Sequence, residues 1–286
     1  MEKSMKSILG KIALAFILLA VCIESGRLIV KDIPADLAEQ LPRAINYNVH
    51  KFVLDKRLGY LAPVVRWNLN GDELFMMVDT GSTDNGLFKN GMRKAIFEYK
   101  VTDLLKQNKY KFSAKLEDRE YILDPYGIFR GEPKKQLIDG WLGLSWMKFY
   151  DDILIDYVNN RIRYNQPPIS DYDIPMCWND KAENKYTIPF TLNGKEMYGI
   201  IDTSSSLTWI NTENLAGKED KNGLYTVNDF SIGDVSYREM EVSSINVVFD
   251  AEDSEKESVQ NNVLGYPCFK DHVIQLDFKN NVFRIK

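Results

Sequence analysis

The chain has 286 residues, of which 44% are hydrophobic and 27% are charged, and its formal net charge is -5. These values are typical of a folded globular protein and exclude disordered and fibrous classes. The weak negative charge, with basic residues spread along the chain, gives no reason to expect a nucleic-acid partner. The length allows one large domain or two small ones.

The first 25 residues differ in kind from the rest of the chain. Three lysines precede an apolar run from Ile12 to Ile23, which is shorter than the about 20 apolar residues that a bilayer span needs. A basic start followed by a short apolar stretch and then by small or polar residues is typical of a secretory signal. We therefore expect residues 1–25 to be a signal peptide or an N-terminal membrane anchor. The protein would then be exported to the periplasm or the cell envelope.

Cys22 closes this apolar run in the sequence Leu19-Ala20-Val21-Cys22, which resembles a bacterial lipobox. A lipoprotein is therefore an alternative to a cleaved signal, although Val21 stands where such motifs have a small residue. A buried N-terminal helix is a further alternative. The two remaining cysteines, Cys177 and Cys268, could pair in an exported protein, and the sequence leaves this open.

The histidine content limits the chemistry. His50 and His272 are the only histidines, which are too few for a multi-histidine metal site. Composition alone leaves a serine–histidine–aspartate triad open, but no nucleophile-elbow motif supports one. We expect neither a metal nor a cofactor.

An internal repeat organises the rest of the chain. Leu69-Asn70-Gly71 and Leu192-Asn193-Gly194 each lead into an apolar strand that ends in Asp-Thr, at Asp79 and at Asp202. Eight positions separate the glycine from the aspartate in both copies. Because Asn-Gly favours a tight hairpin turn, we predict two equivalent hairpins, each with an aspartate at the end of its second strand.

A second matched element follows each aspartate at nearly the same spacing. It consists of an apolar–Gly–apolar motif and then two short strands joined by an Asn-Asn turn. In the first copy these are Trp141–Leu144, Ile153–Tyr157 and Arg161–Tyr164, and in the second they are Val263–Tyr266, Val273–Phe278 and Val282–Ile285. Two matched motifs in the same order indicate duplication of one structural unit.

The paired aspartates indicate a type of chemistry. If a pseudo-two-fold axis relates the two copies, Asp79 and Asp202 become neighbours. Two facing carboxyls share one proton and titrate as a pair. One can then act as general base on a water molecule while the other donates a hydrogen bond to a substrate carbonyl. This arrangement suits amide hydrolysis without a metal or a nucleophilic side chain.

The segment Phe75–Ser82 closely resembles the first catalytic motif of pepsin-like and retropepsin-like aspartic proteases, and Trp141–Leu144 resembles the apolar–apolar–Gly element of that family. The resemblance covers roughly Tyr60 to Lys286. It implies an all-β, bilobal pepsin-like (acid protease) β-barrel fold, with two pseudo-two-fold related lobes and a cleft between them. It also implies a peptide or protein substrate. Each lobe could pair with another chain, as in single-lobe retropepsins, but the internal duplication makes this unnecessary, so we expect a monomer with a complete cleft.

The repeat and the resemblance together predict the domain organisation. We expect an N-terminal aspartic protease lobe at 50–164, a linker rich in proline and acidic residues at 165–184, and a C-terminal lobe at 185–286. Residues 26–49 would lead into the first lobe, with a short helix over Val30–Leu41.

The resemblance also implies the site residues. The catalytic pair is Asp79 and Asp202, and the supporting loop residues are Thr80, Gly81, Ser82, Thr203, Ser204 and Ser205. Hydrogen bonds from Ser82 and Ser205 to the carboxylates would favour their charged forms, which predicts an acidic pH optimum.

A flap hairpin over the cleft is implied between Tyr110 and Pro133. Tyr121 is the first candidate for a flap aromatic and Tyr126 the second. The alternative for either residue is an ordinary strand aromatic.

Ser204 departs from the family pattern, which has glycine at this place. A Cβ atom there would crowd the catalytic water or strain the loop. Two functions are therefore considered. One is an active aspartic endopeptidase, and the other is a catalytically degenerate protein of the same fold that acts as a peptide-binding or structural envelope protein.

Overall fold

The computed structural model describes residues 49–55, 58, 60–69, 72–88, 112–116, 119–124, 137–179, 184–245 and 262–286. These residues form a predominantly β protein with two sheets, one of twelve strands and one of nine, and only short helices. The all-β class expected from the sequence is confirmed at this level.

The first copy of the repeat forms most of the larger sheet. Its elements are β1 (Val49–Asp55), β2 (Tyr60–Leu69), β3 (Asp72–Val78), β4 (Asn85–Leu87), β5 (Phe112–Leu116), β6 (Arg119–Asp124), β7 (Gly140–Leu142), the helix α4 (Leu144–Met147), β8 (Asp152–Asp156) and β9 (Arg161–Tyr164). Strands β2 and β3 form an antiparallel hairpin, and β7 lies parallel beside β3. Strand β4 follows β7, and then come β6 and β5 at the edge of the sheet.

The second copy repeats this order. Its elements are β12 (Lys185–Leu192), β13 (Lys195–Ile201), β14 (Trp209–Asn211), the 3-10 turn η5 (Thr212–Asn214), β15 (Leu224–Val227), β16 (Phe230–Ile232), β17 (Val235–Tyr237), β18 (Met240–Ile245), β19 (Asn262–Leu264), the helix α5 (Tyr266–Phe269), β20 (Val273–Asp277) and β21 (Val282–Ile285). Strand β19 lies parallel beside β13, and β14, β18 and β15 follow in turn, while the hairpin β16–β17 is additional. The sequence repeat is therefore a repeat of one folding unit.

The predicted hairpin turn is confirmed in the second copy. Asn193 and Gly194 have φ angles of 52° and 73°, and the flanking residues Leu192 and Lys195 pair across β12 and β13. Two consecutive positive φ angles are what a tight two-residue hairpin requires, and Asn-Gly adopts them at low cost. In the first copy, Leu69 and Asp72 pair in the same way.

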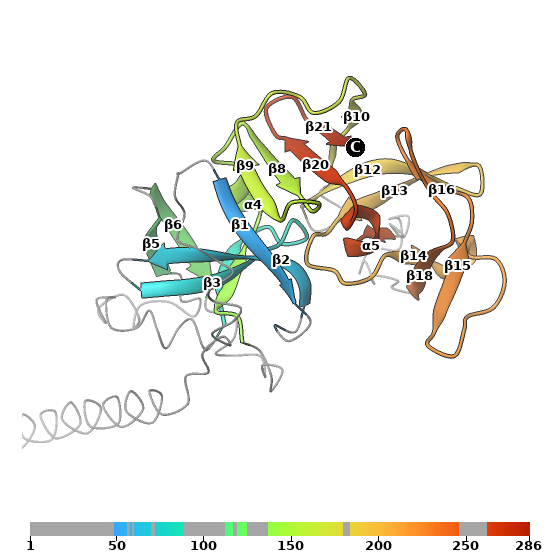
Figure 1. Ribbon diagram of the computed structural model, residues 1–286, viewed down its shortest axis with the longest axis horizontal. Coiled ribbons are helices and arrows are strands. Elements are labelled where there is room, and N and C mark those ends of the chain that lie inside the picture. Colours follow the sequence, from blue (N-terminus) through green and yellow to red (C-terminus); the bar gives the residue numbers. More distant parts are fainter. Residues whose placement is uncertain are drawn as a thin grey trace, which may run out of the picture.

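Strands β8 and β20 join the two copies into one sheet. Leu154 lies opposite Gln275 in this antiparallel pair, with Ile153 opposite Leu276 and Ile155 opposite Ile274. Leu154 and Gln275 occupy equivalent positions in the two copies, so the register is symmetric about this pair of residues. A local two-fold axis therefore passes between β8 and β20, which lie between the remaining strands of the two halves (Figure 1).

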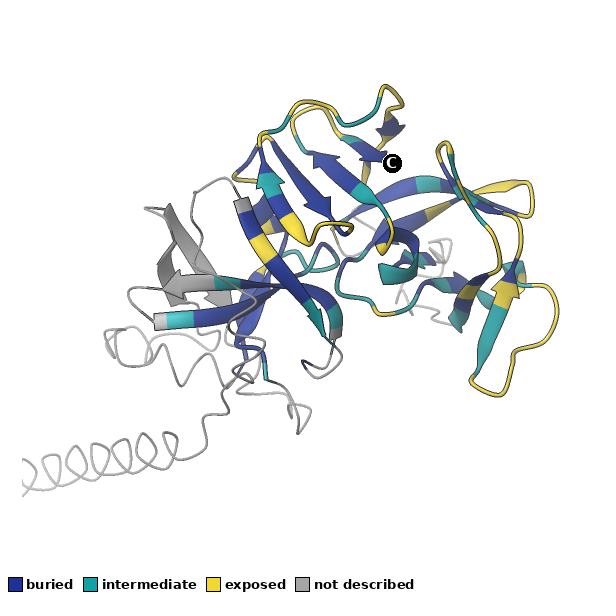
Figure 2. Cartoon of the chain, in the orientation of Figure 1, coloured by how far each residue is buried: buried dark blue, intermediate teal, exposed yellow. Residues whose placement is uncertain are grey.

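One hydrophobic core extends through both halves. Its largest fully buried side chains include Trp146 and Tyr164 from the first copy and Phe190, Phe230 and Phe269 from the second. Burying each such side chain contributes about 1.5–3 kcal/mol. Strands β8 and β20 are buried along most of their length, whereas loops near β15 and β16 are exposed (Figure 2).

The segment expected to be a linker, 165–184, is bonded into both sheets. It contains β10 (Ile174–Pro175), which pairs with β21, and β11 (Cys177–Asn179), which pairs with β12. The connection between the two copies is thus part of the folded structure.

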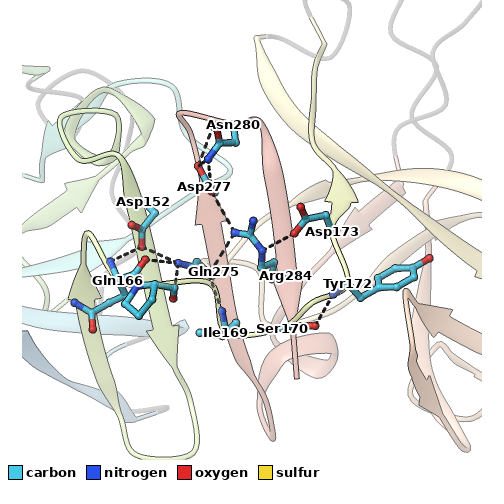
Figure 3. Close-up of polar contacts among 11 residues, drawn as sticks. Asp152, Gln166, Ile169, Ser170, Tyr172, Asp173, Gln275, Asp277, Asn280 and Arg284 are labelled. Atoms are coloured by element: carbon cyan, nitrogen blue, oxygen red, sulfur yellow. Dashed lines mark hydrogen bonds and ion pairs between the residues drawn. The ribbon is translucent and has the colours of Figure 1, made fainter.

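Two buried polar side chains of the shared sheet hold this segment (Figure 3). The Gln275 amide donates to Asp152 Oδ1 (3.0 Å) and to the Gln166 carbonyl (3.1 Å). The Arg284 guanidinium reaches Asp173 (2.6 Å) on the linker and Asp277 (3.2 Å) on β20. Hydrogen bonds satisfy the polar groups of Gln275 and Arg284, which are nearly inaccessible to solvent.

Cys177 and Cys268 are free thiols in the structure, the first exposed and the second buried. The Cys268 thiol lies 3.2 Å from the Thr208 hydroxyl. Burial raises the pKa of Cys268 to about 12, which keeps this thiol protonated and unreactive at neutral pH. The disulfide that the sequence left open is not formed here.

The expectations for 1–25 and for the helix at Val30–Leu41 lie outside the described residues. Within the ranges given above, no helix is long and apolar enough to cross a membrane. Export to the cell envelope stays a prediction from the sequence.

Replacing Arg284 by methionine should destabilise the fold by about 3 kcal/mol, because it leaves the buried Asp277 carboxylate without its cation. Urea unfolding of the full chain measures this loss. The matched control is Lys279→Met, which removes an ion pair with Asp151 whose two side chains are about two-thirds exposed. That control should cost less than about 1 kcal/mol. Equal losses in the two variants would contradict the role assigned to Arg284.

Candidate functional site

Each predicted aspartate directly follows the second strand of its hairpin, Asp79 after β3 and Asp202 after β13. The Asp79 amide donates to the Leu142 carbonyl (2.9 Å), and the Asp202 amide donates to the Leu264 carbonyl (3.0 Å). These bonds continue the parallel pairing of β3 with β7 and of β13 with β19. The chain then leaves the sheet, so each carboxyl is carried on a loop whose base is fixed by two buried strands.

The glycine of each apolar–Gly–apolar motif lies against the loop that follows the aspartate. A Cβ atom on Gly143 would come within 2.3 Å of the Asp84 carbonyl oxygen, and one on Gly265 within 2.1 Å of the Leu207 oxygen. Both distances are far shorter than van der Waals contact, so only glycine fits at these positions. The motif therefore sets how closely each loop approaches its sheet.

Two threonines hold the equivalent loops together across the local two-fold axis. The Thr80 amide donates to Thr203 Oγ1 (3.1 Å), and the Thr203 amide donates to Thr80 Oγ1 (3.0 Å). Each hydroxyl in turn donates to the opposite strand, Thr80 to the Ile201 carbonyl and Thr203 to the Val78 carbonyl, at 2.7 Å in both cases. Both side chains are buried. This reciprocal set of bonds brings together loops that are 123 positions apart.

The threonine contacts bring the two aspartates within range of an electrostatic interaction. A Cβ atom on Gly81 would lie 2.5 Å from the Asp202 carboxyl carbon, so the first loop touches the second aspartate directly. The Asp202 charge also acts on Asp79. The structure thus brings together Asp79, Thr80, Gly81, Asp202, Thr203 and Ser204, all of which the sequence analysis singled out.

The two carboxyls receive different numbers of hydrogen bonds from their own loops. Asp202 Oδ1 accepts from the Ser204 amide (2.9 Å), the Ser204 hydroxyl (2.7 Å) and the Ser205 amide (3.0 Å). Among the described residues, the matching bond to Asp79 Oδ1 comes from the Gly81 amide (2.9 Å). The two loops therefore match in their backbone, but they give the two carboxyls different numbers of hydrogen bonds.

The expectation that the Ser82 and Ser205 hydroxyls bond the carboxylates is wrong. Ser82 Oγ donates to the Asp84 carbonyl (3.2 Å), and Ser205 Oγ donates to the Leu207 carbonyl (2.7 Å). Each hydroxyl also accepts from an indole, Trp141 for Ser82 and Trp209 for Ser205. A serine hydroxyl has one proton, and in both loops that proton goes to a local turn. These serines shape their loops and leave the carboxyls to other donors.

The ionisation of Asp79 also differs from the expectation. Burial raises the pKa of Asp79 to about 7, and the neighbouring Asp202 charge adds to the rise. A hydrogen bond from the Ser204 side chain, the Gly81 amide and the charge of Lys185 oppose it only in part. Asp79 therefore keeps its proton to near neutral pH. The serine bonds that predicted an acidic optimum are absent, so the basis of that prediction is lost.

The proposed flap region is described only in part. Tyr121 lies in β6, which pairs antiparallel with β5, opposite Ala114. A hairpin therefore exists within the predicted segment, and the flap role of Tyr121 stays a prediction. Tyr126 lies outside the described residues.

Two residues near the pair were not identified from the sequence. Lys185, the first residue of β12, lowers the pKa of Asp79 through its charge. Tyr157 follows β8, and burial together with the Asp202 charge raises its pKa. Its hydroxyl is buried without a hydrogen-bond partner in the described parts of the chain. No local motif marks either residue, because their positions depend on how the two halves meet.

The described ranges hold no cluster of three or more His, Cys, Asp or Glu side chains that could bind a metal ion. A hollow of about 300 Å³ lies elsewhere, between the linker and the shared sheet, where Asp152, Gln166 and Arg284 form part of its wall. None of the loop residues around Asp79 and Asp202 lines it.

Comparison with known proteins adds no family to this description. No family model matches the chain, and no match is found among curated proteins.

Replacing Thr203 by valine should destabilise the fold by about 2–4 kcal/mol. The variant keeps the shape of the side chain but leaves the buried Thr80 amide and Val78 carbonyl without their partner. Chemical denaturation monitors the loss, and Thr226→Val on the exposed side of β15 is the matched control, with an expected change within about 0.5 kcal/mol. A Thr203 variant as stable as this control would show that the threonine contact does not hold the loops together.

Replacing Asp79 by asparagine should stabilise the fold at alkaline pH and not at acidic pH. The folded protein holds the Asp79 proton more tightly than the unfolded chain, for which the ordinary value is 3.8. Its contribution is therefore complete below about pH 4 and is lost as pH rises to about 7. Asparagine cannot ionise, so we expect an advantage of roughly 2–4 kcal/mol at pH 8.

Thermal unfolding from pH 4 to pH 8 measures this difference. Asp84→Asn, at an exposed position of the same loop, is the control and should show no comparable pH dependence. If the difference between Asp79→Asn and the native chain is the same at every pH, the pKa of Asp79 is not raised in the folded protein.

Proposed function

We propose that the chain is an aspartic endopeptidase with a bilobal pepsin-like fold, in which Asp79 and Asp202 form the catalytic pair. The observation that carries this proposal is the reciprocal bonding of Thr80 and Thr203, which sets two equivalent Asp-Thr loops against each other. The repeated strand order and the symmetric β8–β20 register support a two-lobed arrangement. Its substrate class is a peptide or protein, and the chain acts as a monomer.

The chemistry needs only the two carboxyls and a water molecule. The ionised carboxylate removes a proton from the water, whose oxygen forms a bond to the carbonyl carbon of the substrate. The protonated carboxyl transfers its proton to the carbonyl oxygen, giving a neutral tetrahedral intermediate. When the carbon–nitrogen bond breaks, the first carboxyl passes the proton from water to the leaving amine, and the second recovers its proton from the intermediate. A pair that holds one proton, as the raised pKa of Asp79 favours, suits these steps.

The second candidate is a degenerate protein of the same fold that binds peptides, or has a structural role in the envelope, without cleaving a substrate. Ser204 is the observation that favours it. At the equivalent place in the first loop, an added Cβ atom would lie 2.5 Å from the opposite carboxyl. Ser204 carries such an atom, so it occupies space beside the pair.

The role of exported peptidase is consistent with the N-terminal sequence, and export is part of the proposal.

Peptidase activity on an unfolded protein or a peptide library tests the proposed function. Replacing either Asp79 or Asp202 by asparagine removes one member of the pair and should lower kcat/KM by about 10²–10⁴-fold. Asp84→Asn, in the loop that follows Asp79, should retain the native rate. Native activity in either of the first two variants would exclude the mechanism.

Binding of pepstatin, a peptide inhibitor of aspartic proteases, separates the two candidates. The endopeptidase should both cleave substrate and bind the inhibitor, and Asp202→Asn should weaken that binding. Peptide binding without cleavage would support the degenerate alternative. Loss of pepstatin binding together with absence of cleavage would leave the proposed active site without support.

A further inference from the structure

Two donors to Asp202 have no matching bond among those described for Asp79, the Ser204 hydroxyl and the Ser205 amide, and only the first belongs to a side chain. Ser204 supplies two of the three hydrogen bonds to Asp202 Oδ1, one from its amide and one from its hydroxyl. Gly81 occupies the same place in the first loop and supplies an amide alone. Hydrogen bonds to a carboxylate favour its charged form. The second loop is therefore built to hold a negative charge more firmly than the first.

The Ser204 hydroxyl donates its hydrogen bond to Asp202. Its oxygen is 2.7 Å from Asp202 Oδ1, which is the distance of a strong charge-assisted hydrogen bond. The hydroxyl also reaches Asp79. Because a hydroxyl has a single proton, the short bond directs that proton to Asp202. The effect of the hydroxyl on Asp79 opposes the rise of the Asp79 pKa only in part.

We propose that Ser204 is a positioning residue that assigns the roles of the pair, by keeping Asp202 as the carboxylate and leaving the shared proton on Asp79. Asp202 is then the general base that accepts the proton of the attacking water. Asp79 is the acid that gives its proton to the substrate carbonyl. This inference rests on the proposed function. The burial of Asp79, which raises its pKa, acts in the same direction.

The effect proposed for the Ser204 hydroxyl differs from steric crowding by the Ser204 Cβ atom. If its Cβ atom blocks the site, removing that atom should increase activity whatever happens to the hydroxyl. If its hydroxyl assigns the proton, removing the oxygen alone should change the pH dependence. Alanine and glycine at this position separate the two readings, because alanine keeps the Cβ atom and glycine does not.

The pH–rate profile of the full chain is the first measurement. Ser204→Ala and Ser204→Gly each remove one hydrogen-bond donor to Asp202. The acid limb of the kcat/KM profile should therefore shift to higher pH by about one unit. Ser204→Thr keeps a hydroxyl and should retain the native limb. Ser206→Ala, at an exposed neighbouring position, is the control and should leave the profile unchanged. An unmoved acid limb in Ser204→Ala, or activation by glycine but not by alanine, would overturn the proposal.

A titration without substrate makes the test independent of activity. Carbon-13 NMR of aspartate-labelled protein follows the ionisation of the pair, with Asp79→Asn and Asp202→Asn to assign the signals. In the native chain the first carboxyl to ionise should be Asp202, and Ser204→Ala should move this step to higher pH by the same amount. If this shift occurs in a chain without peptidase activity, the proposed function fails and the role of Ser204 in the pair stands. If Asp79 ionises first, or if the alanine variant titrates like the native chain, the inference fails even in an active peptidase.

Discussion

The reciprocal hydrogen bonds between Thr80 and Thr203 are the contact on which the candidate site depends. Four buried hydrogen bonds form where the two loops meet, and each joins a group on one loop to the opposite loop or strand. Buried amides and carbonyls that lose a partner are costly. The loops therefore cannot separate without leaving polar groups unpaired. Because each threonine directly follows an aspartate, holding the threonines together also holds the carboxyls together.

Contacts elsewhere in the fold hold the two loops in position. The symmetric pairing of β8 with β20 fixes the relative orientation of the two copies, and Gly143 and Gly265 let each loop lie close to its own sheet. The linker is tied to the shared sheet through Gln275 and Arg284. Duplication of one unit thus produces two nearly equal half-sites. The Ser204 hydroxyl, where the first loop has Gly81, and the bond from the Ser205 amide then make the two carboxyls unequal.

Much of this arrangement follows from the sequence because the repeat is strong. The Leu-Asn-Gly turn of the second copy, the strand-end aspartates and the two apolar–Gly–apolar motifs each correspond to a feature of the structure, since short-range turn chemistry and strand patterning determine them. The partners of Ser82 and Ser205 could not be inferred, because they depend on local turns and on two tryptophans that come from different strands. The ionisation of Asp79 was also missed, because burial and the charge of Asp202 arise only when the halves meet. Tyr157 and Lys185 carry no motif for the same reason.

The distance between the Asp79 and Asp202 carboxyl oxygens, measured in a crystal structure of the protein at near-atomic resolution, tests the central claim most directly. The account predicts that the nearest pair of oxygens lies about 3 Å apart, as in a dyad that shares one proton. It also predicts that the Ser204 hydroxyl lies within hydrogen-bond distance of an Asp202 carboxyl oxygen. Carboxyls separated by more than about 6 Å could not share a proton directly and would contradict a single site formed by both halves of the chain.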